Sequence, residues 1–157
     1  MPHEDQVLKR LDTLGIRLPE APKPVAAYVP WVRSDRLLYI SGQIPFRDGG
    51  LLATGPVPSA TSLEIAQQAA RQCALNGLAV AADALDGRLD RVRRVVRIGV
   101  FVACDPDFDA HPQVANGASE FLIEVFGEAG RHARAAVGSP SLPRGASVEV
   151  ELLFEVD

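Results

Sequence analysis

The spacing of apolar residues predicts two long helices in this chain. From Ser62 to about Leu85, apolar residues recur every three or four positions, and Gly87 marks the end of the pattern. The T-x-x-E sequence formed by Thr61 and Glu64 is typical of a capping box at a helix start. A second helix is predicted within residues 107–126. One stripe of the first helix is made of small residues, which favours close packing on a sheet: Ala66, Ala70, Cys73, Gly77, Val80 and Ala84.

The remaining apolar segments have the lengths and turn boundaries of strands. Residues 26–33 and 36–44 are joined in hairpin fashion by Ser34 and Asp35. In the second half of residues 92–103, apolar residues occupy both odd- and even-numbered positions, which indicates a strand buried on both sides. The last two predicted strands, 132–138 and 147–154, are separated by a turn that is rich in proline and glycine.

These elements follow the order ββαβαββ, which indicates an α+β fold with two helices on one face of a single sheet. Two helices cover only one face, whereas the strand patterns require cover on the other face as well. The simplest solution is a homo-oligomer whose subunits pack sheet against sheet. The alternative is that the N-terminal segment folds over the bare face.

That N-terminal segment contains a short helix and a proline-rich arm. Residues 3–14 place leucines and a valine at helical spacing up to Gly15, and residues 18–25 hold three prolines. We therefore expect a helical extension over residues 1–20 and one main domain over residues 21–157.

Composition and charge argue against nucleic acid as a partner. The chain has 157 residues, of which 47% are hydrophobic and 23% charged, and its formal net charge is −4. Nucleic-acid binding favours a basic surface. Five arginines do cluster between residues 88 and 97, but Asp86 and Asp90 interrupt them and no aromatic residues are interleaved. A solvated turn explains this cluster better than an RNA-binding patch.

The sequence also predicts a cytoplasmic protein without a metal site. Cys73 and Cys104 form no ligand-like cluster and are interpreted as reduced thiols. His3, His111 and His132 are widely separated, so we expect no metal ligand set. The N-terminus lacks the apolar run of a signal peptide, and no stretch approaches the roughly 20 apolar residues that span a bilayer.

Arg134 is the main candidate for binding chemistry. It stands in the middle of a predicted strand of small residues, and its guanidinium, which never loses its charge, needs a carboxylate, a phosphate or solvent beside it. With Glu149 on the next strand, it suggests a pocket for a small anionic metabolite. A structural salt bridge to a neighbouring glutamate, across the sheet or the subunit interface, is the alternative for Arg134. Glu149 would lie on the same face of its strand as Ser147 and Glu151, so the alternative for these three polar residues is a solvated strand face.

Several sequence blocks together resemble the RidA/YjgF family of reactive-intermediate deaminases, whose members are also called L-PSP endoribonucleases. These blocks are YISGQIP at residues 39–45, ALNGL at 74–78, VFV at 100–102, ARAAV at 133–137 and LPRGASVEVE at 142–151. The N-terminal helix is typical of a longer subgroup. The resemblance implies a chorismate-mutase-like α+β fold, a homotrimer, and ligand sites in clefts between subunits.

The resemblance also implies an activity, the hydrolysis of small 2-imino acids to 2-keto acids and ammonia without a cofactor. By position, Arg134 would bind the substrate carboxylate and Glu149 would hold or activate the attacking water. Tyr28 and Ser41 would line the cleft, and Gly42 would let the backbone approach the ligand. Packing for Tyr28 and a strand-end hydrogen bond for Ser41 are the structural alternatives. A trimer that only binds small carboxylates, or an endoribonuclease, is the functional alternative.

Overall fold

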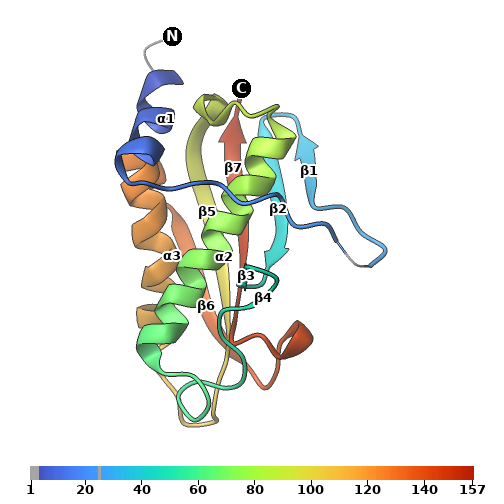
Figure 1. The fold of residues 1–157 in the computed structure, drawn as a ribbon, viewed down its shortest axis with the longest axis vertical. Coiled ribbons are helices and arrows are strands. Elements are labelled where there is room, and N and C mark those ends of the chain that lie inside the picture. Colours follow the sequence, from blue (N-terminus) through green and yellow to red (C-terminus); the bar gives the residue numbers. More distant parts are fainter. Residues whose placement is uncertain (1–3, 25) are drawn as a thin grey trace.

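The protein is built on a five-stranded mixed sheet that is covered by helices on one face (Figure 1). The computed structural model describes residues 4–24 and 26–157. The strand order is β1-β2-β7-β5-β6, in which β5 and β6 are parallel and the other neighbours antiparallel. The strands are β1 (Trp31–Ser34), β2 (Leu37–Gln43), β5 (Val92–Ala103), β6 (Ala133–Ser139) and β7 (Val148–Val156). The α+β prediction is confirmed.

The two predicted long helices are α2 (Leu63–Ala84) and α3 (His111–Phe126). The predicted capping box is wrong, because Ser62 is the N-cap of α2 and its hydroxyl accepts the Ile65 N–H at 3.2 Å. Thr61 is instead buried, and its hydroxyl donates to the Thr54 carbonyl oxygen at 2.8 Å. At the other end of α2, the N–H of Gly87 donates to the Ala82 carbonyl oxygen at 2.7 Å.

Glycines let the helices approach the sheet and each other closely. Gly77 of α2 faces Leu152 of β7, and a β-carbon at Gly77 would overlap that leucine side chain. Gly117 of α3 lies against the backbone of α2, where a β-carbon would overlap the Gln67 carbonyl group. The stripe of small residues on α2 is therefore part of a tight helix-to-sheet contact, as predicted.

Helix α1 (Glu4–Thr13) lies on the same side of the sheet as α2 and α3 (Figure 1). Its Val7 and Leu11 are buried, and it packs against α3 and the short 3₁₀ helix η1 (Leu89–Arg91). The following arm crosses α2 and forms a hollow with Gln72 and Asn76 (Figure 1). The alternative that this segment covers the bare face is thus wrong. His3 and residue 25, which fall within the predicted helix and arm, lie outside the described residues.

Two short features differ from the sequence expectation. Strand β1 begins only at Trp31, after Pro30. The region around Asp48 and Gly49, predicted as a loop, is the turn of a small hairpin formed by β3 (Phe46–Arg47) and β4 (Gly50–Leu51). Asp48 and Gly49 both have positive φ, at 50° and 83°, as the tight turn requires.

The opposite face of the sheet carries no helix among the described residues and exposes apolar side chains. Along β7 the even-numbered residues from Val148 to Val156 are buried, whereas the odd-numbered ones between them are only half-buried. Tyr39 pairs with Leu153 of this open face, and Val137 pairs with Phe101. Tyr39 and Val137 remain 45% and 48% exposed. This surface is therefore available for a partner.

Candidate functional site

Four of the five predicted site residues line one cavity. Tyr28, Ser41, Gly42 and Glu149 surround a hollow of about 140 Å³ at the end of β2 and the start of β7. Lys23 of the N-terminal arm and Arg144 also border it. The cavity thus combines one carboxylate with two cationic side chains at its margin.

Ser41 holds the loop that carries Tyr28. Its hydroxyl donates to the Val29 carbonyl oxygen at 2.7 Å, and its backbone N–H donates to the Pro30 carbonyl oxygen at 2.9 Å. Tyr28 itself remains 51% exposed. The strand-end hydrogen bond expected as the alternative for Ser41 is therefore present, and it fixes one wall of the cavity.

Gly42 makes room for the carboxylate of Glu149, because a β-carbon at this position would overlap Oε1 of the glutamate. Glu149 is half-buried, and this burial, together with the charge of Glu151, raises its pKa above the ordinary value of 4.5. Glu151 has its own partner, since its Oε1 lies 3.2 Å from Nη1 of Arg97. In the described part of the chain, no ion pair neutralises Glu149. A carboxylate in this state is suited to accept a proton from water.

Arg134 lies apart from this cavity. Its strand β6 is followed along the chain by β7, which carries Glu149 as predicted, but β5 lies between these two strands in the sheet. Arg134 pairs with Ile98, which is buried under the helices, whereas Glu149 pairs with Phe101 and points to the open face. The two residues thus occupy opposite faces of the sheet within one chain.

The guanidinium of Arg134 is held by neutral oxygen atoms of α3. Nη1 donates to Oδ1 of Asn116 at 2.9 Å and to Oγ of Ser119 at 3.1 Å. Nη2 donates to the Pro112 carbonyl oxygen at a longer 3.4 Å. Within residues 4–24 and 26–157, no carboxylate forms an ion pair with Arg134, so the salt-bridge alternative finds no support there. The guanidinium keeps its full charge at an exposed sheet edge.

His132 continues this hydrogen-bond chain behind Ser119. Its Nδ1 lies 2.6 Å from the Gly130 carbonyl oxygen and its Nε2 lies 2.9 Å from Oγ of Ser119. A neutral ring therefore donates from Nδ1 and accepts the Ser119 proton at Nε2, which leaves the serine oxygen to accept from Arg134. Burial lowers the pKa of His132 below 6.5, and the charge of Arg134 lowers it further.

Several residues of these two sites were not predicted, among them Lys23, Asn116, Ser119 and Arg144. Asn116 and Ser119 lie on α3, and Arg144 belongs to the 3₁₀ turn η3 (Pro143–Gly145). Arg144 has a positive φ of 59°, and its guanidinium carbon lies 4.6 Å from the centroid of the Phe46 ring. A polar serine at a buried helix position was the available sign for Ser119. The turn geometry that places the Arg144 side chain beside the cavity could not be predicted from a comparable sequence pattern.

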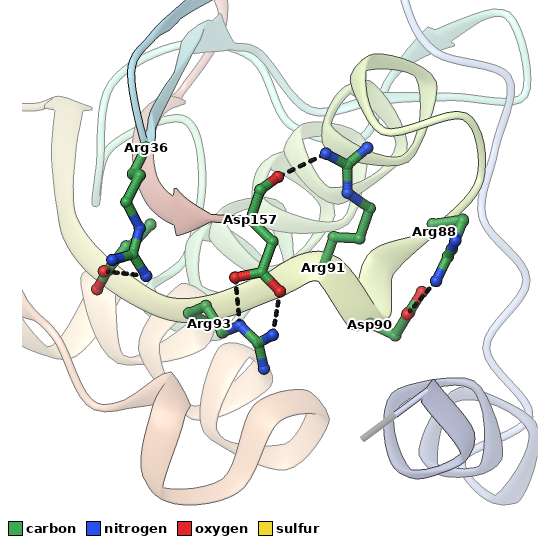
Figure 2. A network of polar contacts seen from close by, with 7 residues as sticks. Arg36, Arg88, Asp90, Arg91, Arg93 and Asp157 are labelled. Carbon is green, nitrogen blue, oxygen red and sulfur yellow. Dashed lines mark hydrogen bonds and ion pairs between the residues drawn. The ribbon is translucent and has the colours of Figure 1, made fainter. Parts of the chain in front are cut away.

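The arginine cluster at the start of β5 is tied to acidic groups, as Figure 2 shows. Arg93 forms an ion pair with the carboxylate of Asp157, and Arg91 donates to the Asp157 carbonyl oxygen. Arg88 lies 3.1 Å from Oδ2 of Asp90. These contacts agree with the expected solvated turn. They neutralise positive charge that a nucleic-acid-binding surface would need.

The described ranges offer neither a metal-binding cluster nor a membrane-spanning helix. They contain no group of three or more His, Cys, Asp or Glu side chains placed to hold a metal ion. Over the same ranges, no helix has both the length and the apolar character needed to cross a membrane.

Comparison with known proteins gives consistent matches over nearly the whole chain. Residues 8–156 match the family model described as "YjgF/chorismate mutase-like, putative endoribonuclease". Protein TCP17 of Trypanosoma cruzi is 46% identical over 153 residues, covering 97% of this chain and 95% of the relative. The crystal structure of Atu1372 from Agrobacterium tumefaciens, a protein of unknown function, is 44% identical with a TM-score of 0.90, covering 99% of this chain and 95% of that one. A 2-iminobutanoate/2-iminopropanoate deaminase of Dermatophagoides farinae is 27% identical over 143 residues, which is 90% of this chain and 95% of the relative.

Proposed function

Because this chain belongs to the YjgF/chorismate mutase-like family, we propose that it hydrolyses small 2-imino acids to 2-keto acids and ammonia. The deaminase relative supports this choice of reaction. We place the reaction in the cytoplasm, since both cysteines are free thiols. No cofactor takes part in the proposed reaction.

The chemistry needs one anchor and one proton acceptor. A 2-imino acid has a carboxylate next to an electrophilic C=N carbon. Arg134 binds the carboxylate, and Glu149 takes a proton from water while the water oxygen bonds to the imine carbon. The C=N π electrons move to nitrogen, which takes the proton from Glu149 and so restores the carboxylate. The resulting carbinolamine then expels ammonia and leaves the 2-keto acid, so that one water is consumed for each ammonia released.

We propose that the anchor and the proton acceptor come from two different copies of the chain. Within one chain they lie on opposite faces of the sheet, with β5 between their strands. Arg134 sits on the edge strand β6, where it can reach a neighbouring copy. The exposed apolar side chains of the open face, such as Tyr39 and Val137, supply a surface for that association. A homotrimer packed through this face would create three equivalent clefts.

One observation carries the proposal. The guanidinium of Arg134 is oriented by Asn116 and Ser119 but paired with no carboxylate among the described residues, and it is exposed. A structural arginine would normally be neutralised by an acid, whereas an anion-binding arginine must retain its charge for the ligand.

The proposal is tested by generating 2-iminobutanoate in place with threonine dehydratase and following 2-ketobutanoate formation. We expect the protein to accelerate imine decay, and Arg134→Ala to abolish the acceleration. Arg131→Ala is the matched control, because Arg131 lies three residues away and its side chain forms an ion pair with exposed Glu128. The control should act like the wild type.

The alternatives give different outcomes in the same assay. Unchanged imine decay together with measurable 2-keto acid binding would identify a carboxylate-binding protein without turnover. Loss of activity in both arginine variants would attribute the effect to general damage. An endoribonuclease would cleave RNA with a strong dependence on salt, and its activity should persist in Arg134→Ala.

A further inference from the structure

A cysteine and a histidine form a second reactive pair at the other end of β6. Cys104 follows directly after β5, and His111 is the first residue of α3. The Sγ atom of Cys104 lies 3.5 Å from Nε2 of His111, within the range of a hydrogen bond to sulfur. Both side chains are only partly buried, so small molecules have access to them.

The surroundings of this pair leave it open. The pair borders a surface pocket of about 580 Å³, which includes Phe108 and several prolines. Phe108 meets the His111 ring edge-on, with the ring centroids 5.1 Å apart. Gly138 of β6 passes over the pair, and a β-carbon there would lie 2.7 Å from both Sγ and Nε2. A glycine at this position keeps the thiol uncovered.

We propose that Cys104 and His111 form a thiol addition site for small α,β-unsaturated carbonyl compounds. In the addition, Nε2 of His111 takes the thiol proton and the thiolate sulfur bonds to the β-carbon of the unsaturated compound. The C=C π bond breaks and its electron pair moves toward the carbonyl oxygen. The His111 imidazolium then returns the proton to the α-carbon, so the product is a saturated thioether and no oxidant is required. Phe108 and the prolines of the pocket wall suit an uncharged organic compound, and the carboxylate of Asp105, which also lines the pocket, already accepts hydrogen bonds from Ser59.

Within one chain, the thiol pair lies away from Arg134, the anchor of the proposed deaminase reaction. Gly138 stands four residues beyond Arg134 on β6, a distance of about 13 Å along an extended strand. The inference rests on the geometry of the thiol pair alone, and it holds whether or not the protein hydrolyses imines.

The second cysteine of the chain provides an internal control. Cys73 lies in the middle of α2, is fully buried, and its Sγ contacts the Val148 carbonyl oxygen at 3.7 Å. Burial raises its pKa well above the ordinary value. In the folded protein Cys73 should therefore stay unmodified while Cys104 reacts.

The experiment treats the folded protein with N-ethylmaleimide at pH 7 and measures the adduct on each cysteine by peptide mass spectrometry over time. We expect Cys104 to react about tenfold faster than N-acetylcysteine under the same conditions, and Cys73 to react only after denaturation. His111→Asn should slow the Cys104 reaction by about tenfold. Gly138→Ala should slow it by placing a methyl group over the sulfur, without removing either partner.

The proposal is overturned if Cys104 of the wild-type protein reacts no faster than N-acetylcysteine, a comparison that needs no variant. It is also overturned if His111→Asn, shown by circular dichroism to be folded, reacts at the wild-type rate. Cys104→Ser should lose the fast adduct entirely, and a fast adduct that persists on Cys73 would contradict the assignment.

Discussion

The charge of Arg134 is the residue-scale feature on which the proposed function depends. Asn116 and Ser119 fix the direction of the guanidinium with neutral oxygens, and His132 in turn fixes the proton of Ser119. An arginine oriented in this way loses little conformational entropy when it binds a carboxylate. The side chain is prepared for an anion without being neutralised in advance.

Ser119→Ala tests this orientation. We expect the variant to bind a 2-keto acid about fivefold more weakly, because one hydrogen bond that holds the guanidinium is worth about 1 kcal/mol. Isothermal titration with 2-ketobutanoate measures the change. Ser141→Ala is the control, since Ser141 is an exposed residue of the loop between β6 and η3. Equal affinities for the wild type and Ser119→Ala would show that the serine does not position Arg134.

His132 predicts a pH dependence of stability. Its folded-state pKa is lowered below 6.5, first by burial and also by Arg134, so the unfolded chain binds the proton more readily. The stability that His132 contributes is therefore present above pH 6.5 and is lost as the pH falls through the lowered folded-state pKa. Urea unfolding of the wild type and His132→Asn at pH 7.5 and at more acidic pH measures this loss. The advantage of the wild type should shrink on acidification, and a constant difference would contradict the assignment.

At the scale of elements, α3 connects packing to the site. One side of α3 contacts α2 at Gly117. Its polar residues Asn116 and Ser119 accept hydrogen bonds from Arg134 on β6. The two helices approach so closely that a shift of α3 would move the acceptors away from the guanidinium. The α2–α3 contact therefore supports both stability and ligand binding.

Gly117→Ala tests the helix contact. Alanine gains about 1 kcal/mol in helix propensity over glycine, but its methyl group would strike the Gln67 backbone, which cannot rotate away. We expect a net destabilisation of about 2 kcal/mol, toward the upper end of overpacking costs, measured by urea unfolding. Gly50→Ala is the control, because open space surrounds that position. If Gly117→Ala were as stable as the wild type, the close approach of the helices would be wrong.

The same scale shows what a sequence pattern can and cannot reveal. Strand β5 was predicted with its observed bounds, because apolar residues at both odd and even positions of its second half indicate a buried strand. The hairpin around Asp48 was missed, since two-residue strands bury too little to leave a pattern. Tyr28, Ser41, Gly42 and Glu149 were predicted as site residues and line one cavity. Arg144 and Lys23 at its margin were not predicted, nor was the separation of Arg134. Apolar periodicity does not show that β5 inserts between two strands that are consecutive in the chain.

At the scale of the whole molecule, the main feature is the open sheet face, which exposes apolar side chains. Helices cover one side, while Tyr39 and Val137 remain exposed on the other. Burying this face between copies would remove apolar surface from water and bring β6 of one copy toward the Glu149 cavity of another. Association and function are thus expected to depend on the same surface.

Val137→Glu tests this dependence. We expect the wild type to have three times the 16.8 kDa chain mass by light scattering, and the variant to be a folded monomer without deaminase activity, because three buried glutamates would repel each other. Leu8→Glu, an exposed position on α1, is the control and should remain a trimer. A monomeric wild type would contradict the proposed assembly.

Subunit mixing is the most direct measurement of the central claim. Arg134→Ala and Glu149→Gln are each expected to be inactive; they are unfolded together, refolded as a mixture and assayed for imine hydrolysis. If every cleft takes its arginine from one copy and its glutamate from the next, random assembly restores about one quarter of the wild-type activity. A mixture as inactive as its two components would show that the two residues do not act across a subunit boundary.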